Sequence, residues 1–239
     1  MIVSNKIYRL ITSRNFLKIV ELYHRIFKKF SKKKIKTPNF YNSKIYRYDI
    51  VQEIIKLKNY KSYLEIGCDQ NELFSKIEVE NKIGVDPHNG GTHRMKSDEF
   101  FKNNRMKFDI IFIDGLHIYK QVKKDIINSL NNLNDKGVIL LHDCFPQTYL
   151  DQAIPRGQRK WNGDVWKAIV EFRTKDQLRT YVGAFDNGIG LIFKKKNNKK
   201  LITQIRSFKD ISYDQYYNNY KEFLNLVSYE EFLKIINEF

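Results

Sequence analysis

The sequence predicts an α/β protein in which a largely parallel sheet lies between two layers of helices. Short β-branched apolar runs alternate with helical patterns from residue 61 onward, and carboxylates follow most of these runs. An Asn-Gly pair later separates two more apolar runs, which is typical of a hairpin. Alternation of strand and helix favours parallel strands joined by right-handed crossovers. The 239 residues suffice for one such domain with helical additions.

Five apolar runs form the expected parallel part of the sheet. They are short and rich in Ile, Val and Leu, as buried parallel strands are. The predicted strands are Ser62–Ile66, Lys82–Val85, Thr92–Met95, Asp109–Ile113 and Val138–Leu141. The helices expected between and after them are Asn71–Ile77, Ser97–Asn103, Tyr119–Leu133 and Asp164–Arg173.

The expected hairpin consists of Thr180–Phe185 and Gly190–Lys194, joined through Asp186-Asn187-Gly188. After it, Ile211–Phe239 contains two capping boxes, Ser212 with Gln215 and Ser228 with Glu231. We therefore expect a domain over 59–200 and a helical C-terminal extension over 201–239.

The N-terminal part is strongly basic. Residues 1–47 contain thirteen of the 43 Lys and Arg residues and a single acid. This segment therefore supplies most of the chain's net charge of +16. Apolar residues at three- and four-residue steps predict a helix over Asn15–Phe30, followed by a Lys-rich linker over Ser31–Pro38 and a second helix over Ile45–Lys58. We expect residues 1–58 to form a basic helical extension.

Three roles for this extension stay open. It can lie on an anionic membrane surface, or pack on its own domain or on a second copy in a homo-oligomer. Nucleic-acid binding is the least favoured, because the basic residues are not interleaved with a known binding motif.

Composition excludes several classes of protein. No apolar stretch reaches 18 residues, and Met1–Arg9 is followed by no apolar signal core, so neither a spanning helix nor a secretory signal is expected. Cys68 and Cys144 are too few for a disulfide framework. We expect a cytoplasmic protein, with peripheral membrane contact as an option, and two cysteines that serve packing.

Ligands of open α/β sheets bind outside the carboxyl ends of the strands, and this sequence places polar residues there. An acid about twenty residues after the first strand can accept hydrogen bonds from ribose hydroxyls, and Asp86 has this spacing. The G-x-G-x-x-G pattern is absent, which argues against a dinucleotide. Alternatively, Asp86 caps a turn, Asp114 caps the segment after its strand, and His142-Asp143 is a structural pair.

The segments Glu65-Ile66-Gly67, Val85-Asp86-Pro87 and Phe112-Ile113-Asp114-Gly115 resemble class I S-adenosylmethionine-dependent methyltransferases. The resemblance covers about Lys61–Lys194 and implies a Rossmann-like doubly wound sheet of five parallel strands with a C-terminal antiparallel hairpin. Within it, Phe112–Pro146 is similar to a bacterial methyltransferase-like branch, with IDGxHxY and HDxxP motifs, that is often met near glycan-assembly enzymes.

The resemblance implies S-adenosylmethionine as cofactor and gives roles to the strand ends. The loop at Gly67 approaches the methionine end, the acid matching Asp86 holds the ribose, and Ser97 with Asp98 lies near the adenine. The implied cofactor-binding residues are Glu65, Gly67, Cys68, Asp69, Asp86, Pro87, Ser97, Asp98 and Asp114.

Some members of this superfamily hold a divalent cation at the same rim. The resemblance assigns Asp114 and Asp143 as ligands for Mg²⁺ or a similar ion, which prefers oxygen. Cys144 stands where the catechol type has an asparagine ligand, so the third ligand stays open among Asp69, His117 and His142. A neutral imidazole suits a general base at pH 7, and we expect His117 in that role, with His142 as the competing base.

The long loop Phe145–Asn162 contains Arg156, Arg159 and Trp161, which suit an anionic or sugar-like acceptor unless the loop is merely solvated. We therefore expect an O-methyltransferase acting on a saccharide or another small hydroxylated acceptor. The alternative is a non-catalytic cofactor-binding or scaffold module of the same fold in glycan assembly. A nucleic-acid methyltransferase is disfavoured, because Asp114-Gly115-Leu116-His117 replaces the N/D-P-P-Y/F tetrad of amino-group enzymes.

Overall fold

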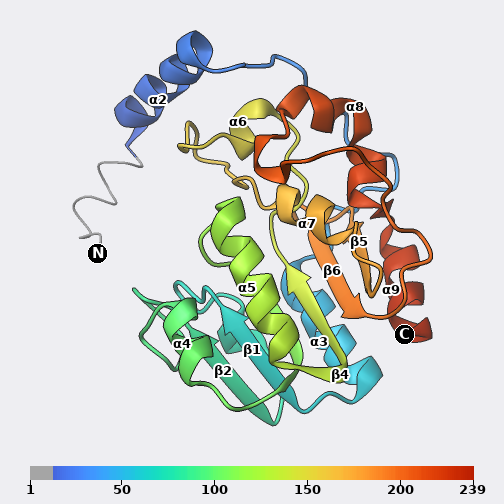
Figure 1. Ribbon diagram of the computed structural model, residues 1–239. Coiled ribbons are helices and arrows are strands. Elements are labelled where there is room, and N and C mark those ends of the chain that lie inside the picture. Colours follow the sequence, from blue (N-terminus) through green and yellow to red (C-terminus); the bar gives the residue numbers. More distant parts are fainter. Residues whose placement is uncertain (1–12) are drawn as a thin grey trace.

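The computed structural model describes residues 13–239 and contains one seven-stranded sheet (Figure 1). The strand order is β2-β1-β3-β4-β6-β5-β7. The strands are β1 Ser62–Ile66, β2 Asn81–Val85, β3 Phe108–Ile113, β4 Leu133–Leu141, β5 Leu178–Gly183, β6 Ile189–Lys194 and β7 Leu226–Val227. The strands β1 to β4 are mutually parallel, so their carboxyl ends meet at one edge.

The predicted hairpin is confirmed. β6 lies antiparallel between β4 and β5, with Leu140 opposite Leu191 and Tyr181 opposite Leu191 on the other side. The connecting residues Asp186, Asn187 and Gly188 all have positive φ, which Asp, Asn and Gly tolerate better than other residues. The hairpin therefore extends the parallel sheet and returns its own turn to the edge where β3 and β4 end.

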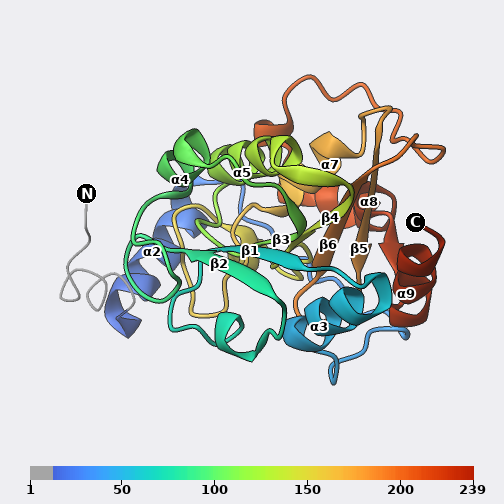
Figure 2. The ribbon, with the colours of Figure 1, turned by 90° about the horizontal axis from the view of Figure 1, so that it is seen from below.

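Helices cover both faces of the sheet (Figure 2). One face carries α3 and α9, and the other carries α4, α5, α7 and α8. The bounds are α2 Arg14–Phe27, α3 Arg47–Lys58, α4 Ser97–Asn103, α5 Tyr119–Asn131, α6 Tyr149–Gln152, α7 Trp166–Phe172, α8 Tyr213–Leu224 and α9 Tyr229–Glu238, with 3₁₀ turns η1 Phe74–Lys76 and η2 Phe208–Asp210.

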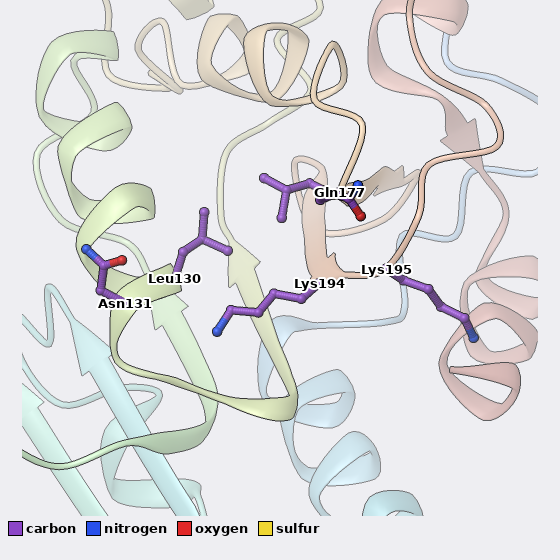
Figure 3. A pocket seen from close by; sticks show the side chains of 6 residues that line it. Leu130, Asn131, Gln177, Lys194 and Lys195 are labelled. Carbon is purple, nitrogen blue, oxygen red and sulfur yellow. The ribbon is translucent and has the colours of Figure 1, made fainter.

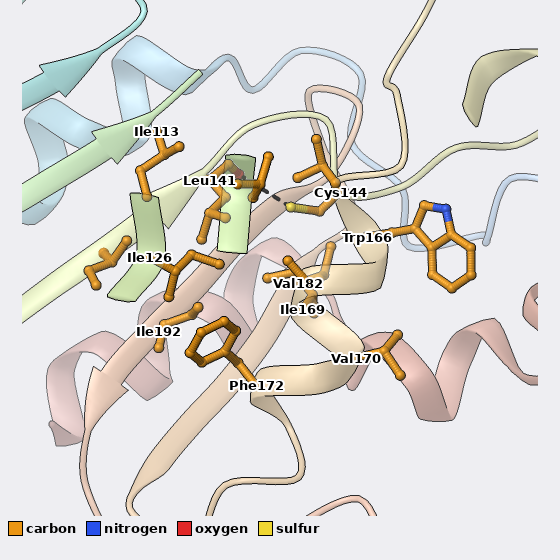
Figure 4. Close-up of a cluster of buried hydrophobic side chains, with 14 of the residues drawn as sticks. Ile113, Ile126, Leu141, Cys144, Trp166, Ile169, Val170, Phe172, Val182 and Ile192 are labelled. Atoms are coloured by element: carbon orange, nitrogen blue, oxygen red, sulfur yellow. Dashed lines mark hydrogen bonds between the residues drawn. The ribbon is translucent and has the colours of Figure 1, made fainter. Parts of the chain in front are cut away.

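Alternation along the buried strands divides the core into two clusters. On β3, Ile110 and Phe112 point to the α3 and α9 side, whereas Ile111 and Ile113 point to the other side. Figure 4 shows side chains of the second cluster, including Cys144, whose thiol contacts the carbonyl of Leu141. The class of fold predicted from the sequence is thereby confirmed.

Several predicted elements differ from the structure. Thr92–Met95 forms no strand, and only one isolated bridge joins His93 to Val85, so four rather than five parallel strands precede the hairpin. The chain instead turns back at Gly90 and Gly91, both with positive φ, and the amides of Thr92 and His93 donate to the carbonyl of Gly84.

Asn71–Ile77 contains only the 3₁₀ turn η1, and the Lys82 ammonium donates to the carbonyls of Phe74 and Ile77 at 2.9 Å each. The expected Lys-rich linker after α2 is an ordered segment, with Lys34 paired to Thr148 and Ile35 buried. The part of the predicted extension within 1–12, including the expectation for Met1–Arg9, lies outside the described residues. Within 13–239, no helix has the length and apolar character needed to cross a membrane.

Trp166 is fully buried on α7, with its ring centroid 4.3 Å from that of Tyr216 on α8. We expect Trp166→Ala to lower the free energy of unfolding by about 3–5 kcal/mol, because it removes a large ring and leaves a cavity. Equilibrium denaturation checks this value. The exposed Ile202→Ala serves as control and should change stability little; an equal loss in both variants would contradict the assignment of Trp166 to the core.

Candidate active site

Five ionisable side chains converge at the edge where the parallel strands end. Two follow β3, two follow β4, and one comes from the turn between β5 and β6. The residues are Asp114, His117, His142, Asp143 and Asp186. We call this set the rim cluster.

His117 links the loops after β3 and β4. Its Nε2 lies 3.2 Å from Oδ1 of Asp114, and its Nδ1 lies 3.1 Å from Oδ2 of Asp143. Its backbone carbonyl accepts from the amide of Asp164, and a Cβ added to Gly163 would lie 1.9 Å from the same oxygen. Only glycine therefore allows the loop before α7 to approach His117 this closely.

His142 links the same carboxylates to the hairpin turn. Its Nδ1 lies 3.3 Å from Oδ1 of Asp114, and its Nε2 lies 3.4 Å from Oδ1 of Asp186. Arg47, at the start of α3, donates its backbone N–H to Asp186 at 2.6 Å and places its Nε 3.9 Å from Asp114. His142 and Arg47 therefore lie beside the carboxylates that follow β3, β4 and β5.

The charges of the rim cluster shift one another's pKa. Burial acts against ionisation of Asp114, but His142 and His117 outweigh it and hold the pKa of Asp114 well below its usual range. Burial likewise disfavours a charged His117, yet Asp114 and Asp143 raise its pKa to about 10. The pKa of His142 is also raised, against burial, by Asp114 and Asp143.

The expected role of His117 as a general base stays a prediction, and it requires a neutral imidazole. The two adjacent carboxylates favour the protonated form instead, because they raise the pKa of His117 to about 10. His117 can accept a proton only when the negative charge of Asp114 and Asp143 is neutralised by something else.

The donor set fits a divalent cation. One atom each from Asp114, His117 and Asp143 lies within 4.8 Å of the others, and two carboxylates with an imidazole suit such an ion. Of the three candidates for a third ligand, His117 joins this group within the described chain, whereas Asp69 and His142 do not.

Asn162 adds an oxygen donor to the same place. Its Nδ2 donates to Oδ1 of Asp143 at 2.9 Å, which fixes the orientation of the amide, since the reverse orientation would oppose two oxygens. Its Oδ1 is buried and has no hydrogen-bond partner among the described residues. Buried polar atoms are seldom left unpaired, so this oxygen is a candidate for a further ligand atom beside Asp143.

The predicted cofactor loop contacts the rim cluster through its backbone. Gly67 follows β1 with φ of +90°, and a Cβ there would lie 2.3 Å from the carbonyl oxygen of Asp114. Glycine is therefore required for this close approach. The amide of Asp114 in turn donates to the carbonyl of Ile66, so the two loops keep a fixed spacing.

Asp86 lies at the end of β2 beside this loop, as predicted, but its carboxylate is already bonded. Oδ2 accepts from the amide of Asp69 at 3.0 Å, and Oδ1 accepts from the amides of His88 and Asn89. The turn-capping alternative thus describes these contacts. A carboxylate offers about four lone-pair positions, so one remains for a further donor.

The other predicted cofactor residues are less close together. Glu65 and Cys68 are buried beneath the loop, whereas Asp69 and Pro87 are exposed. Ser97 and Asp98, at the start of α4, both accept from Nε2 of Gln121 on α5. Whether they lie beside an adenine stays a prediction.

Of the predicted acceptor residues, Trp161 lies nearest the rim cluster. Its ring is stacked on the imidazole of His117, with centroids 5.6 Å apart and planes at 10°. The guanidinium of Arg156 instead donates to the carbonyls of Gln158 and Arg159, so it orders its own loop. The Arg159 side chain is exposed.

Two surface pockets bear on the position of the site. One, of about 320 Å³, borders the rim cluster and is lined by Tyr46, Arg47, Tyr48, Glu72, Leu73, Lys76 and Asp186. The other, of about 520 Å³, lies between the end of α5 and the outer ends of β5 and β6, around Gln177 and Lys194 (Figure 3). Only the first pocket shares residues with the contacts of the rim cluster.

Sequence reasoning did not identify Arg47, Asn162 or Asp186 as site residues. Asp186 was interpreted only as a turn residue, although its turn follows the same edge rule as the other strand ends. Arg47 was counted with the basic extension, and Asn162 lies at the end of a loop whose path the sequence does not determine.

Comparison with known proteins agrees with this architecture. Residues 49–144 match a family model described as a methyltransferase domain, a stretch that runs from α3 past β4 and includes Asp86, Asp114 and Asp143. No curated protein matches the chain.

Solved structures show only distant likeness. The methyltransferase PaMTH1 from Podospora anserina, bound to S-adenosylhomocysteine, has 14% identity and a TM-score of 0.49, covering 63% of this chain and 78% of its own. The O-methyltransferase TomG from Streptomyces achromogenes, bound to S-adenosylmethionine, has 12% identity and a TM-score of 0.43, with 75% and 89% covered. An O-methyltransferase from Bacillus cereus has 12% identity and a TM-score of 0.43, with 77% and 93% covered. Since all three TM-scores are below 0.5, they add no argument about the site.

Residues 49–144 are therefore similar to a methyltransferase domain, and they contribute β1 to β4 of the sheet. The strand β6 lies between β4 and β5 in the same sheet.

Glu65 gives the site a pH-dependent stability. Burial raises its pKa from 4.5 to about 7, with Asp114 adding to the shift and the Tyr63 hydroxyl and Arg47 opposing it. The folded chain therefore retains a proton that the unfolded chain has lost, and stability falls as the pH rises from 4.5 through about 7.

Glu65→Gln keeps an acceptor for the Tyr63 hydroxyl and removes this titration. Its free energy of unfolding should exceed that of the wild type by up to about 3 kcal/mol near pH 8, and the gain should vanish near pH 4. Denaturant unfolding at both pH values checks this, with the exposed Glu80→Gln as control. A gain independent of pH would contradict the assigned titration.

Proposed function

We propose that this protein is an S-adenosylmethionine-dependent O-methyltransferase that acts on a saccharide or another small hydroxylated acceptor with the help of a divalent cation. The observation that carries the proposal is the rim cluster, where Asp114, His117 and Asp143 meet beside the Gly67 loop. A methyltransferase domain needs such a polar group only where it must bind and activate an acceptor.

In this proposal, His117 takes the proton of the acceptor hydroxyl. S-adenosylmethionine supplies an electrophilic methyl group, and a divalent cation would lower the pKa of a hydroxyl bound to it. Asp114 and Asp143, with Asn162 or His117, would hold that cation. Its charge would also lower the pKa of His117, so that Nε2 or Nδ1 becomes free to take the proton.

The surrounding residues keep this arrangement rigid. Asn162 orients Asp143 through a 2.9 Å hydrogen bond, and Trp161 covers one face of the His117 ring. Arg47 and His142 balance Asp186 and Asp114, which limits the repulsion among three carboxylates in a partly buried place.

Aromatic surfaces support a sugar-like acceptor. Trp161 presents a ring beside His117, and Tyr46 and Tyr48 stack on each other, with centroids 6.2 Å apart, at the pocket that borders Arg47. Aromatic faces pack well on the apolar faces of sugar rings, while Arg47 and Lys76 suit acidic substituents. Both cysteines of the chain are free thiols, which supports a reducing, cytoplasmic site of action.

One observation favours the alternative of a non-catalytic module. The three backbone amides on Asp86 leave few acceptor positions for ribose hydroxyls, so cofactor affinity is the first property to measure.

Calorimetric titration with S-adenosylhomocysteine provides that measurement. We expect binding by the wild type and a loss of at least about tenfold in Asp86→Ala, because hydrogen bonds to a charged acceptor disappear. Asp176→Ala, which removes an exposed carboxylate, should bind as the wild type does. Absence of binding in the wild type would refute the methyltransferase proposal and favour the non-catalytic module.

Titration with Mn²⁺ separates the two roles of His117. Asp143→Asn should weaken Mn²⁺ binding by at least about tenfold, whereas Asp176→Asn should not. If His117 is the base, His117→Ala should keep most of the Mn²⁺ affinity and lose at least about a hundredfold in methyl transfer to a hydroxylated acceptor. If His117 is a ligand, His117→Ala should lower the Mn²⁺ affinity and the rate of methyl transfer together. Unchanged Mn²⁺ binding in Asp143→Asn would contradict the cation site.

A further inference from the structure

The helix α2 carries a wider apolar face than the protein covers. Leu17, Val20 and His24 are buried, and His24 contacts the domain through Pro155 and Tyr149. Beside them runs an exposed apolar stripe, whose residues are 38% to 71% accessible within the described structure. Its members are Ile19, Leu22, Tyr23, Ile26 and Phe27. Exposed apolar patches of this kind mark interaction surfaces.

Specific contacts fix the direction of this stripe. Nε2 of His24 lies 2.7 Å from the carbonyl oxygen of Pro155, and its Nδ1 lies 3.2 Å from the hydroxyl of Tyr149 on α6. The ring of Phe30 packs on Tyr149 as well, with centroids 5.0 Å apart. Figure 1 shows α2 extending from the body of the protein near α6. The stripe therefore has a set position relative to the loop that leads to Trp161.

The segment that follows α2 is strongly basic. Lys33 is paired with Asp214 at 3.3 Å, while its neighbours are exposed and, within residues 13–239, form no ion pair. These exposed lysines are Lys28, Lys29, Lys32, Lys34 and Lys36. The only acid between residues 13 and 40 is Glu21, which is bound to Arg25 at 2.6 Å. An apolar stripe thus adjoins a dense group of uncompensated positive charges.

We propose that the exposed stripe of α2 and the lysines of residues 28–36 form a docking surface for an anionic lipid bilayer. The apolar side chains would enter the boundary between headgroups and acyl chains, and the ammonium groups would remain among the phosphates. A second copy of the chain fits this surface less well, because a twofold contact would bring the same lysines toward one another.

The docking surface also orients the methyltransferase site, a step that rests on the proposed function. His24 joins α2 to Pro155, and the same loop carries Trp161 to the imidazole of His117. A bilayer bound at α2 would therefore lie beside the loop that contacts the rim cluster through Trp161. The acceptor class that this geometry favours is a saccharide carried on a lipid at the membrane surface.

Flotation of the full-length protein with lipid vesicles tests the docking surface. We expect binding to phosphatidylcholine vesicles that contain phosphatidylglycerol and none to phosphatidylcholine alone, with weaker binding at high salt. Ile26→Glu should weaken binding by at least about tenfold, because it replaces an exposed isoleucine that would enter the bilayer with a charge facing anionic lipid. Lys32→Ala or Lys34→Ala should each weaken it by about fivefold.

Matched controls make the result specific. Ile202→Glu changes an isoleucine that is 88% exposed and remote in sequence, so it should float as the wild type does. Ile19→Glu repeats the test of Ile26→Glu at a second place in the stripe. Circular dichroism confirms that each variant is folded.

Three outcomes would overturn the proposal: no flotation with anionic vesicles, equal binding to neutral ones, or equal loss in Ile202→Glu. A dimer in solution that Ile26→Glu dissociates would show that a second copy covers the stripe instead. Binding of S-adenosylhomocysteine, measured without vesicles, remains independent of these results, so failure of the docking surface and failure of the proposed function are distinguishable.

Discussion

The charge balance of the rim cluster constrains the rest of the structure. Asp114 is held ionised by His117 and His142, and the same imidazoles stay protonated because carboxylates surround them. Removing any one charge leaves another uncompensated in a partly buried place, which costs more than the pair itself contributes. The close backbone approaches at Gly67 and Gly163 bring the loops near enough for this balance to exist. The ionisation of these side chains therefore depends on the positions of the loops, and the positions of the loops depend on that ionisation.

The apolar layers beneath the rim cluster hold its charged side chains in place. The strands β1, β3 and β4 are largely buried toward their carboxyl ends, and their apolar side chains there divide between two apolar clusters. Dense apolar packing beneath the edge holds the strand ends at fixed spacing, so the side chains that follow them cannot separate to relieve repulsion. The low stability that a charged edge brings is offset by the core below it.

The sequence predicted most of the sheet because its signals are local. Apolar runs identified β1 to β4, and the Asn-Gly pair identified the hairpin. It misplaced Thr92–Met95 because the turn at Gly90 and Gly91 depends on contacts with Gly84, which no local pattern shows. The strand ends and the resemblance to a family together singled out Asp114, His117, His142 and Asp143, and these side chains do converge. Sequence reasoning missed Arg47, Asn162 and Asp186, since their approach to the edge depends on the paths of loops and of the N-terminal segment. The raised pKa of His117 could not be inferred either, because it depends on two acids whose distance only the fold determines.

The hydrogen bond between Arg47 and Asp186 joins residues 139 positions apart. Asp186 also partners His142, so the rim cluster lacks one of its acids until the hairpin is in place. During synthesis, a chain still attached to the ribosome can form β1 to β4 and their helices well before β5 and β6 emerge. In that nascent state two histidines face only two of their three carboxylates, and the first N–H of α3 lacks its acceptor. The rim cluster is thus completed only after the hairpin has formed, and a product truncated after β4 would lack the partner that Asp186 provides to His142 and Arg47.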